Sequence, residues 1–159
     1  MENANPIIKN NLEKRFDLQL VSGKLANVTK ESIFELIRDI MDPEHPHTLE
    51  QLNVVSLEDI YISQLEDESV MCQAGQPINC VNIIFTPTVP HCSMAGIIGL
   101  TIIYKLQKIV DGYLINVLIK ADTHSTYKAL NKQFSDRDRV MAAFENEGLV
   151  EMMKFCTNE

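Results

Sequence analysis

The sequence predicts an α+β fold: a two-layer domain with a small mixed sheet, one long central helix and a helical C-terminus. Residues 81–85 form an apolar run typical of a buried strand, and apolar residues recur at helical spacing from residue 94 to residue 110. Residues 113–120 alternate as in a strand, and the chain beyond residue 130 shows only helical patterns. Strand segments on both sides of one helix favour a sheet of about four strands with helices packed against it.

The predicted elements follow in order from a polar N-terminus. Residues 1–26 are expected to form a flexible leader, before a single domain at 27–159. Thr29 is a good N-cap for a helix from residue 30 to about residue 41, which Asp42 and Pro43 end. Strands are predicted at 54–55, 60–62, 70–72, 79–85 and 113–120, and the other helices at 94–110, 130–134, 136–144 and 149–155. In the leader, the candidate docking residues are Phe16, Leu18, Leu20 and Val21.

The composition and charge of the chain argue against several classes of function. A net charge of −8 without a basic cluster argues against direct nucleic-acid binding, because most such affinity comes from neutralising phosphates. The longest apolar run, 94–104, is shorter than the roughly 20 residues of a membrane span, so we expect a soluble protein. The four cysteines form no CxxC pair, and we interpret them as reduced thiols in the cytosol or nucleus.

The most informative motif is Pro90-His91-Cys92, at the predicted transition from strand to helix. Pro90 suits a first helical turn, since its missing N–H would be unpaired there. Cys92 would then lie near the positive end of a helix dipole, which stabilises a thiolate, and His91 can add charge or a second ligand. The alternative is that Cys92 is a small apolar residue that packs the helix start.

A second candidate segment is acidic, histidine-bearing and stiffened by two prolines. Its histidines are either metal ligands or contact residues, or the segment is a rigid turn in which His45 caps backbone groups. The second interpretation is favoured, because histidines two apart in an extended loop point to opposite sides. The segment reads Asp42-Pro43-Glu44-His45-Pro46-His47.

A third candidate segment, 122–126, follows a predicted strand and precedes helical sequence. Its His124 is either a ligand or the base that deprotonates Cys92. Equally, Thr123, Ser125 or Thr126 caps the helix and His124 is an ordinary loop residue.

Three weaker signals have structural interpretations. Gly96 and Gly99 suit close approach of another backbone, either the sheet or a second subunit. Arg137 and Arg139 are expected on a solvated helix face. Cys156 is expected to be buried packing rather than a ligand.

Four blocks, in register from about residue 27 to residue 156, resemble the cytosolic iron–sulfur assembly component 2 family (MIP18-like), relatives of the bacterial SufT and PaaD proteins. The blocks are residues 36–55, 86–95, 123–133 and 136–156. Relatives usually carry glycine at the position of Asp122 and glutamate at that of Tyr127, so this chain departs from the family pattern at both.

The resemblance implies a non-enzymatic adaptor of the cytosolic iron–sulfur targeting complex, which delivers clusters to cytosolic and nuclear apoproteins. It implies WD40 β-propeller and HEAT-repeat partners, a cytoplasmic and also nuclear location, and a homodimer, with no direct nucleic-acid or membrane contact. Cys92 would be the functional thiol, and the candidate cluster or metal ligands are His91, Cys92 and His124. The motif or partner-contact residues would be Asp42, Pro43, Glu44, His45, Pro46, Pro90, Thr123, Asn131, Lys132 and Gln133.

No tightly bound cofactor is expected, at most a transient iron–sulfur cluster or Zn²⁺. One cysteine cannot hold a cluster alone, so other ligands must come from partners, His91 or a second subunit. One alternative function is a small module that holds Zn²⁺ or Fe²⁺. A weaker one is a thiol enzyme that uses Cys92 and His124, for which no resolving cysteine or orienting carboxamide is identifiable.

Overall fold

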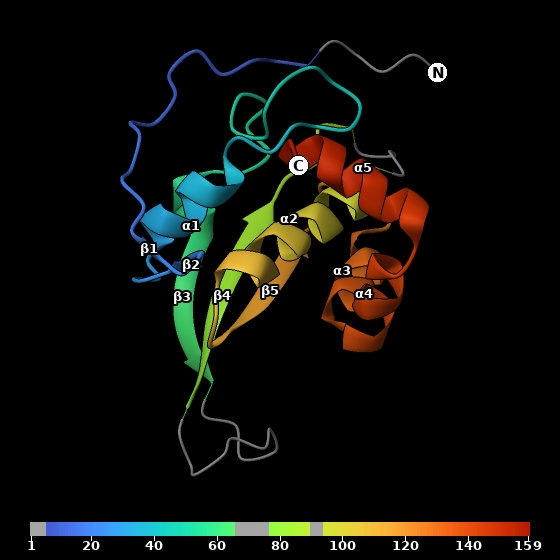
Figure 1. The fold of residues 1–159 in the computed structure, drawn as a ribbon. Coiled ribbons are helices and arrows are strands. Elements are labelled where there is room, and N and C mark those ends of the chain that lie inside the picture. The colour runs from blue at the N-terminus through green and yellow to red at the C-terminus, as the bar shows by residue number, and fades with distance from the viewer. Residues whose placement is uncertain (1–5, 66–76, 90–93) are drawn as a thin grey trace.

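The computed structural model describes residues 6–65, 77–89 and 94–159, and it confirms the mixed α+β class (Figure 1). The main sheet contains β3 (Ile60–Leu65), β4 (Ile78–Phe85) and β5 (Tyr113–Ile119), in the order β3-β4-β5. Strand β4 pairs antiparallel with β3 and parallel with β5, so the predicted mixed sheet is confirmed. The strand predicted at 70–72 lies outside the described residues.

Two further short strands form a separate hairpin, β1 (Leu20–Val21) and β2 (Lys24–Leu25). This hairpin joins neither edge of the main sheet, which has three strands in the described part of the chain rather than about four. Residues 54–55, predicted as strand, are instead a buried bend before the short helix η1 (Leu57–Asp59). Their apolar character reflects burial in a loop, which periodicity does not distinguish from a strand.

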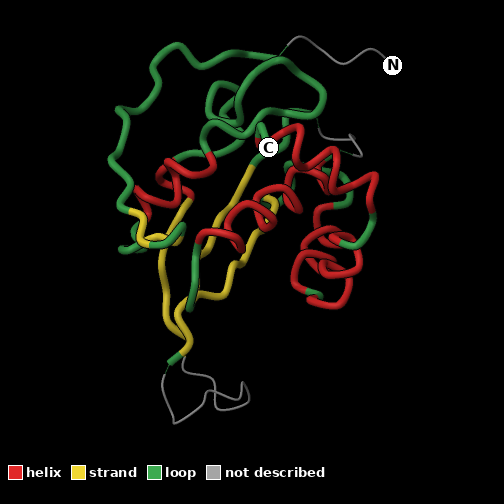
Figure 2. Tube along the Cα trace, viewed as in Figure 1, coloured by secondary structure: helices red, strands yellow, loops and turns green. Residues whose placement is uncertain are grey.

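The helices gather in two places (Figure 2). Helices α1 and α2 lie over one face of the sheet, and the helices after β5 complete a helical C-terminus as predicted (Figure 1). None of the described helices is long and apolar enough to cross a membrane. Their bounds are α1 (Lys30–Ile37), α2 (Ala95–Ile109), α3 (Tyr127–Ser135), α4 (Arg137–Phe144) and α5 (Glu147–Thr157).

Helix α1 begins as predicted and ends early. The Thr29 hydroxyl accepts the Ser32 N–H at 3.1 Å, and the Ser32 hydroxyl accepts the Thr29 N–H at 2.9 Å, which is a reciprocal capping box. The helix ends at Ile37 rather than near residue 41, because the Met41 N–H, which would donate to the Ile37 carbonyl in a longer helix, donates to the Cys156 carbonyl instead. The chain therefore leaves α1 in a loop that folds back on the end of the helix.

Part of the predicted leader contacts α1. Phe16 packs edge-on against Phe34 with 6.5 Å between ring centroids, and Phe16 and Leu18 are half-buried against the core. Leu20 and Val21, the other candidate docking residues, are 51% and 65% exposed. The domain boundary near residue 26 stays a prediction.

A buried ion-pair network fixes the same segment to α1. Arg38 is 1% exposed and donates to both carboxylate oxygens of Glu50, at 2.9 and 3.0 Å. It also donates to Glu35 and to the carbonyls of Glu13 and Lys14, so all five guanidinium N–H groups have acceptors. Burial alone would raise the pKa of Glu35, but hydrogen bonds from Arg38 and neighbouring groups outweigh it and lower that pKa.

The close approach expected at the α2 glycines is made by side chains of α3. A Cβ built on Gly99 would lie 2.3 Å from the ring of Phe134, whereas one on Gly96 would meet Leu130 at an ordinary 3.5 Å. The expected approach of the sheet backbone is therefore wrong, and the approach of a second subunit stays a prediction. Gly99 is required because the Phe134 ring occupies the space of its missing side chain.

Candidate functional site

Two loops and the described residues after β4 meet at the carboxyl edge of β4. Because β4 and β5 are parallel, their last residues lie side by side, and the Lys120 N–H donates to the Phe85 carbonyl at 2.9 Å. The next N–H, of Thr86, donates to the Val54 carbonyl at 2.9 Å. This edge therefore gathers the loop 41–55, the segment after β4 and the loop 120–126 (Figure 1).

Pro90, His91 and Cys92 lie outside the described residues. They follow the described segment 86–89 in sequence, and Cys92 precedes the α2 N-cap residue, Met94, by two positions. Helix α2 itself is confirmed from residue 95 to residue 109. The dipole argument for a Cys92 thiolate stays a prediction.

His124 is buried in the loop that enters α3. It is 6% exposed, and its Nδ1 accepts the backbone N–H of Thr126 at 3.1 Å. Neutral imidazole that accepts at Nδ1 carries its proton on Nε2, so service as a metal ligand or base requires this hydrogen bond to break. The geometry fits an ordered loop histidine, and the ligand role stays a prediction.

The hydroxyls of this loop do not cap α3. Thr126 occupies the N-cap position without a side-chain cap hydrogen bond, and its Oγ1 lies 3.2 Å from His124 Nδ1. The Thr123 hydroxyl donates to the Lys120 carbonyl at 2.6 Å, which ties the loop to the end of β5. Of the predicted caps Thr123, Ser125 and Thr126, Thr126 therefore occupies the N-cap position, but its hydroxyl does not cap the helix.

The backbone explains one departure from the family pattern. Asp122 has φ of 62°, in the left-handed region that glycine adopts freely and aspartate tolerates. The turn into the His124 loop therefore keeps the shape that a glycine there would favour. Tyr127, the other departure, is the first residue of α3 and is half-buried.

Asp42 organises the 42–47 segment. It is 5% exposed, and its Oδ1 accepts the backbone N–H groups of Glu44 and His45, at 2.8 and 3.0 Å. Its own N–H donates to the carbonyl of His47. The segment is therefore the rigid turn that was expected, but Asp42 rather than His45 caps the backbone. Pro43 is half-buried and Pro46 is exposed.

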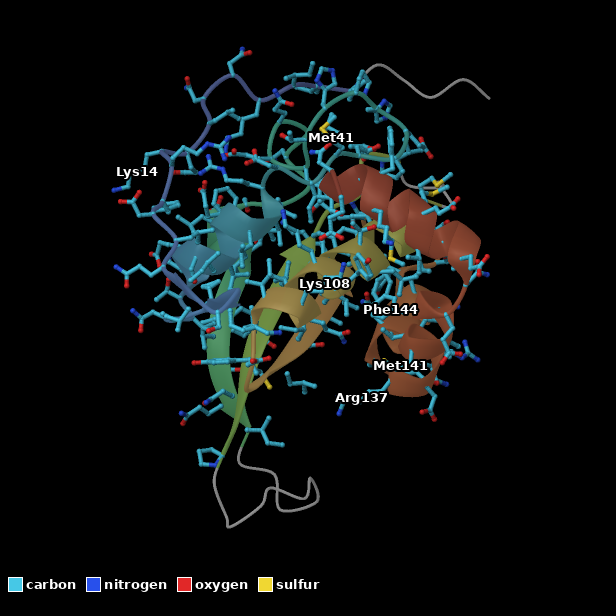
Figure 3. The ribbon with its side chains drawn as sticks, viewed as in Figure 1. Lys14, Met41, Lys108, Arg137, Met141 and Phe144 are labelled. Carbon is cyan, nitrogen blue, oxygen red and sulfur yellow. The ribbon has the colours of Figure 1, made fainter. Side chains whose placement is uncertain are left out.

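His45 carries an unusual buried atom. Its Nε2 is shielded from solvent and has no hydrogen-bond partner among the described residues. A buried ring nitrogen normally has a partner, because an unsatisfied polar atom costs about 1–3 kcal/mol. The neighbouring Met41 N–H donates to the Cys156 carbonyl at 2.8 Å, which places this segment beside α5 (Figure 3).

The candidate contact residues on α3 divide into two kinds. The Asn131 side chain accepts the N–H of Ile119 at 2.7 Å and donates to its carbonyl at 3.3 Å, so it pairs the end of β5 as a neighbouring strand would. Lys132 and Gln133 are exposed. Asn131 therefore supports the loop that carries His124, whereas its two neighbours are open to contact.

The two described cysteines have unreactive environments. Cys80 is 2% exposed and Cys156 is 1% exposed. Burial raises the pKa of both thiols, and the Asp42 carboxylate raises that of Cys156 further. These thiols stay protonated near neutral pH, so Cys156 packs the core as expected.

The described residues contain no group of three or more histidine, cysteine, aspartate or glutamate side chains that could hold a metal ion. The predicted donors His91 and Cys92 lie outside the described residues, so the set of ligands stays a prediction.

Curated proteins of similar sequence cover most of this chain. A mouse protein named cytosolic iron–sulfur assembly component 2B is 41% identical over 162 aligned residues, covering 98% of this chain and 90% of that protein. The Drosophila melanogaster MIP18 family protein galla-2 is 40% identical over 161 aligned residues, covering 98% of this chain and 94% of that protein. A Caenorhabditis elegans MIP18 family protein is 46% identical over 125 aligned residues, covering 78% of this chain and 72% of that protein. No family model matches the sequence.

Proposed function

The chain belongs to the MIP18 family of cytosolic iron–sulfur assembly components, and on that premise we propose that it is an adaptor that helps deliver iron–sulfur clusters to cytosolic and nuclear apoproteins. The observation that carries this proposal is the similarity to the mouse protein, which spans nearly all of both chains. The names of these relatives describe assembly components and family members, not enzymes.

Cys92 is the thiol that we assign to this function. The environments of Cys80 and Cys156 support the assignment, because both thiols are buried and have raised pKa values. Of the other two cysteines, Cys92 is the one next to the start of α2, a helix of 15 residues whose N-terminal dipole favours a thiolate. Thiolates are the usual ligands of iron–sulfur clusters.

The cluster is cargo that this subunit contacts together with other proteins. One thiolate is too few to hold it, and the hydrogen bond at His124 Nδ1 competes with coordination by that ring. The remaining ligands therefore come from His91, from the buried His45 nitrogen or from partners. We propose the WD40 β-propeller and HEAT-repeat subunits of the targeting complex as those partners.

The test is affinity purification of tagged wild-type and Cys92→Ser protein from its own cells, with partners identified by mass spectrometry. The wild type is expected to recover a WD40 propeller, a HEAT-repeat protein and iron–sulfur apoproteins, and the variant is expected to retain the first two. Failure of the wild type to recover either subunit would contradict the adaptor function.

A further inference from the structure

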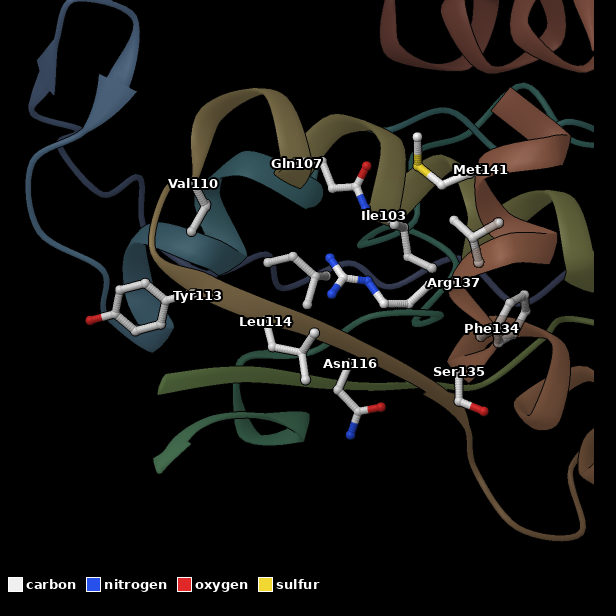
Figure 4. Close-up of a pocket in the computed structure, with 12 residues that line it drawn as sticks. Ile103, Gln107, Val110, Tyr113, Leu114, Asn116, Phe134, Ser135, Arg137 and Met141 are labelled. Atoms are coloured by element: carbon white, nitrogen blue, oxygen red, sulfur yellow. The ribbon is translucent and has the colours of Figure 1, made fainter. Parts of the chain in front are cut away.

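An open groove of about 600 Å³ lies away from the candidate site, between α2, β5 and the turn from α3 to α4 (Figure 4). Four consecutive residues of β5 line it, 113–116. Side chains alternate between the faces of a strand, so four in a row line a groove only where the edge of the strand faces it. The other residues that line it are Ile103, Gln107, Val110, Phe134, Ser135, Arg137, Val140 and Met141.

The edge of β5 that faces this groove has unused hydrogen-bonding groups. The Lys120 N–H points toward β4, while the N–H and carbonyl of Ile119 point away from β4, to Asn131. The alternation of a strand makes Ile115 and Tyr113 point the same way as Ile119. No strand or side chain of the described residues pairs with their outward N–H and carbonyl groups.

The groove also carries a positive charge. Among the described residues that line it, Arg137 is the only charged one, in a chain of net charge −8. Its guanidinium extends from α4 into the groove, and within the described part of the chain it forms no ion pair (Figures 3 and 4). The nearby Asp136 instead pairs with Arg139, at 3.6 Å. Met141, beside it, is an apolar side chain that is 53% exposed.

We propose that this groove binds an extended segment of a partner protein, which adds a strand to the β5 edge and places an acidic side chain against Arg137. Strand addition supplies backbone hydrogen bonds at Tyr113 and Ile115, and the apolar walls accept the side chains on either side of the acid. At about 3.3 Å per residue, the open edge pairs with roughly three to five residues. The proposal rests on the groove and is independent of iron–sulfur assembly.

The test uses the full chain, labelled for NMR, and a short capped peptide in which valine alternates with polar residues around a central glutamate. Matched peptides carry glutamine or lysine at that position. The glutamate peptide is expected to shift the amide signals of Tyr113 and Ile115 and to bind about two- to fivefold more tightly than the lysine peptide, as one exposed ion pair allows.

Two variants of α4 complete the test. Arg137→Glu is expected to reverse the order of the two charged peptides, whereas Arg139→Glu, a matched change outside the groove, should leave it unchanged. Equal binding of all three peptides, binding that leaves the Tyr113 and Ile115 amides unshifted, or no binding at all would overturn the proposal. A reversal by Arg139→Glu as large as that by Arg137→Glu would also overturn it, because the preference would then follow net charge alone.

Discussion

Replacing Arg38 by methionine is expected to destabilise the protein by about 3–5 kcal/mol, the usual cost of leaving a buried charge without its partner. The Arg38 and Glu50 side chains are 1% and 2% exposed. Without the guanidinium, the Glu50 carboxylate keeps only the backbone N–H of Glu13, at 2.9 Å. The variant also loses the hydrogen bonds to the carbonyls of Glu13 and Lys14, so these two residues should be held less tightly, while Phe16 stays packed against Phe34.

Urea unfolding measures this effect, and faster limited proteolysis near residues 13 and 14 reports their loosening. Arg15→Met is the matched control. The side chains of Arg15 and Asp39 are 59% and 50% exposed, and its second partner, Glu35, keeps its ion pair with Arg38, so the change should cost about 0–1 kcal/mol. In the double variant Arg38→Met/Glu50→Leu no charge is left unpaired, and at least half of the lost stability should return. An Arg38→Met protein within about 1 kcal/mol of wild type, or a double variant as unstable as the single one, would refute the reasoning.

Three further predictions concern packing, pH and the support of the site. Gly99→Ala should destabilise the protein by about 1–3 kcal/mol through overpacking, whereas Gly96→Ala should leave its stability unchanged or raise it. Urea unfolding curves of the two variants test this difference. The folded protein lowers the pKa of Glu35, so the stabilisation from this carboxylate should be complete above the ordinary glutamate pKa and be lost as the pH falls through the lowered one; Glu35→Gln should flatten that slope in urea titrations at several pH values. Asn131→Leu should lower the unfolding free energy by about 1–3 kcal/mol and speed amide exchange at the end of β5, because it leaves the N–H and carbonyl of Ile119 unpaired. Unchanged exchange would contradict the pairing of Asn131 with β5.

The sequence predicted correctly those helices and strands that are determined by the residues within them. The helix cap at Thr29, the alternation of β5 and the long apolar helix α2 all appear where expected. The predictions failed where contacts with residues distant in the sequence determine the local structure. Val54 and Val55 are buried by a loop that bonds to the end of β4, and Gly99 accommodates a ring 35 positions away in the chain.

The candidate site shows the same division. The sequence located the loops that meet at the β4 edge, because strand ends and proline-rich turns have local signatures. It did not show that Asp42 rather than His45 caps its turn, or that Asn131 pairs the end of β5, since both depend on side-chain direction. The Arg38–Glu50 pair and the Arg137 groove left no spacing signal, because their parts come from separate elements.

The most direct test of the central claim is cluster delivery in cells that carry only a variant of this protein. Radioactive iron recovered with an immunoprecipitated cytosolic iron–sulfur enzyme measures that delivery. With Cys92→Ala the iron should fall to background, whereas Cys80→Ala, which alters a buried thiol of raised pKa, should retain it. Full delivery by Cys92→Ala protein would contradict the assignment of Cys92 as the functional thiol.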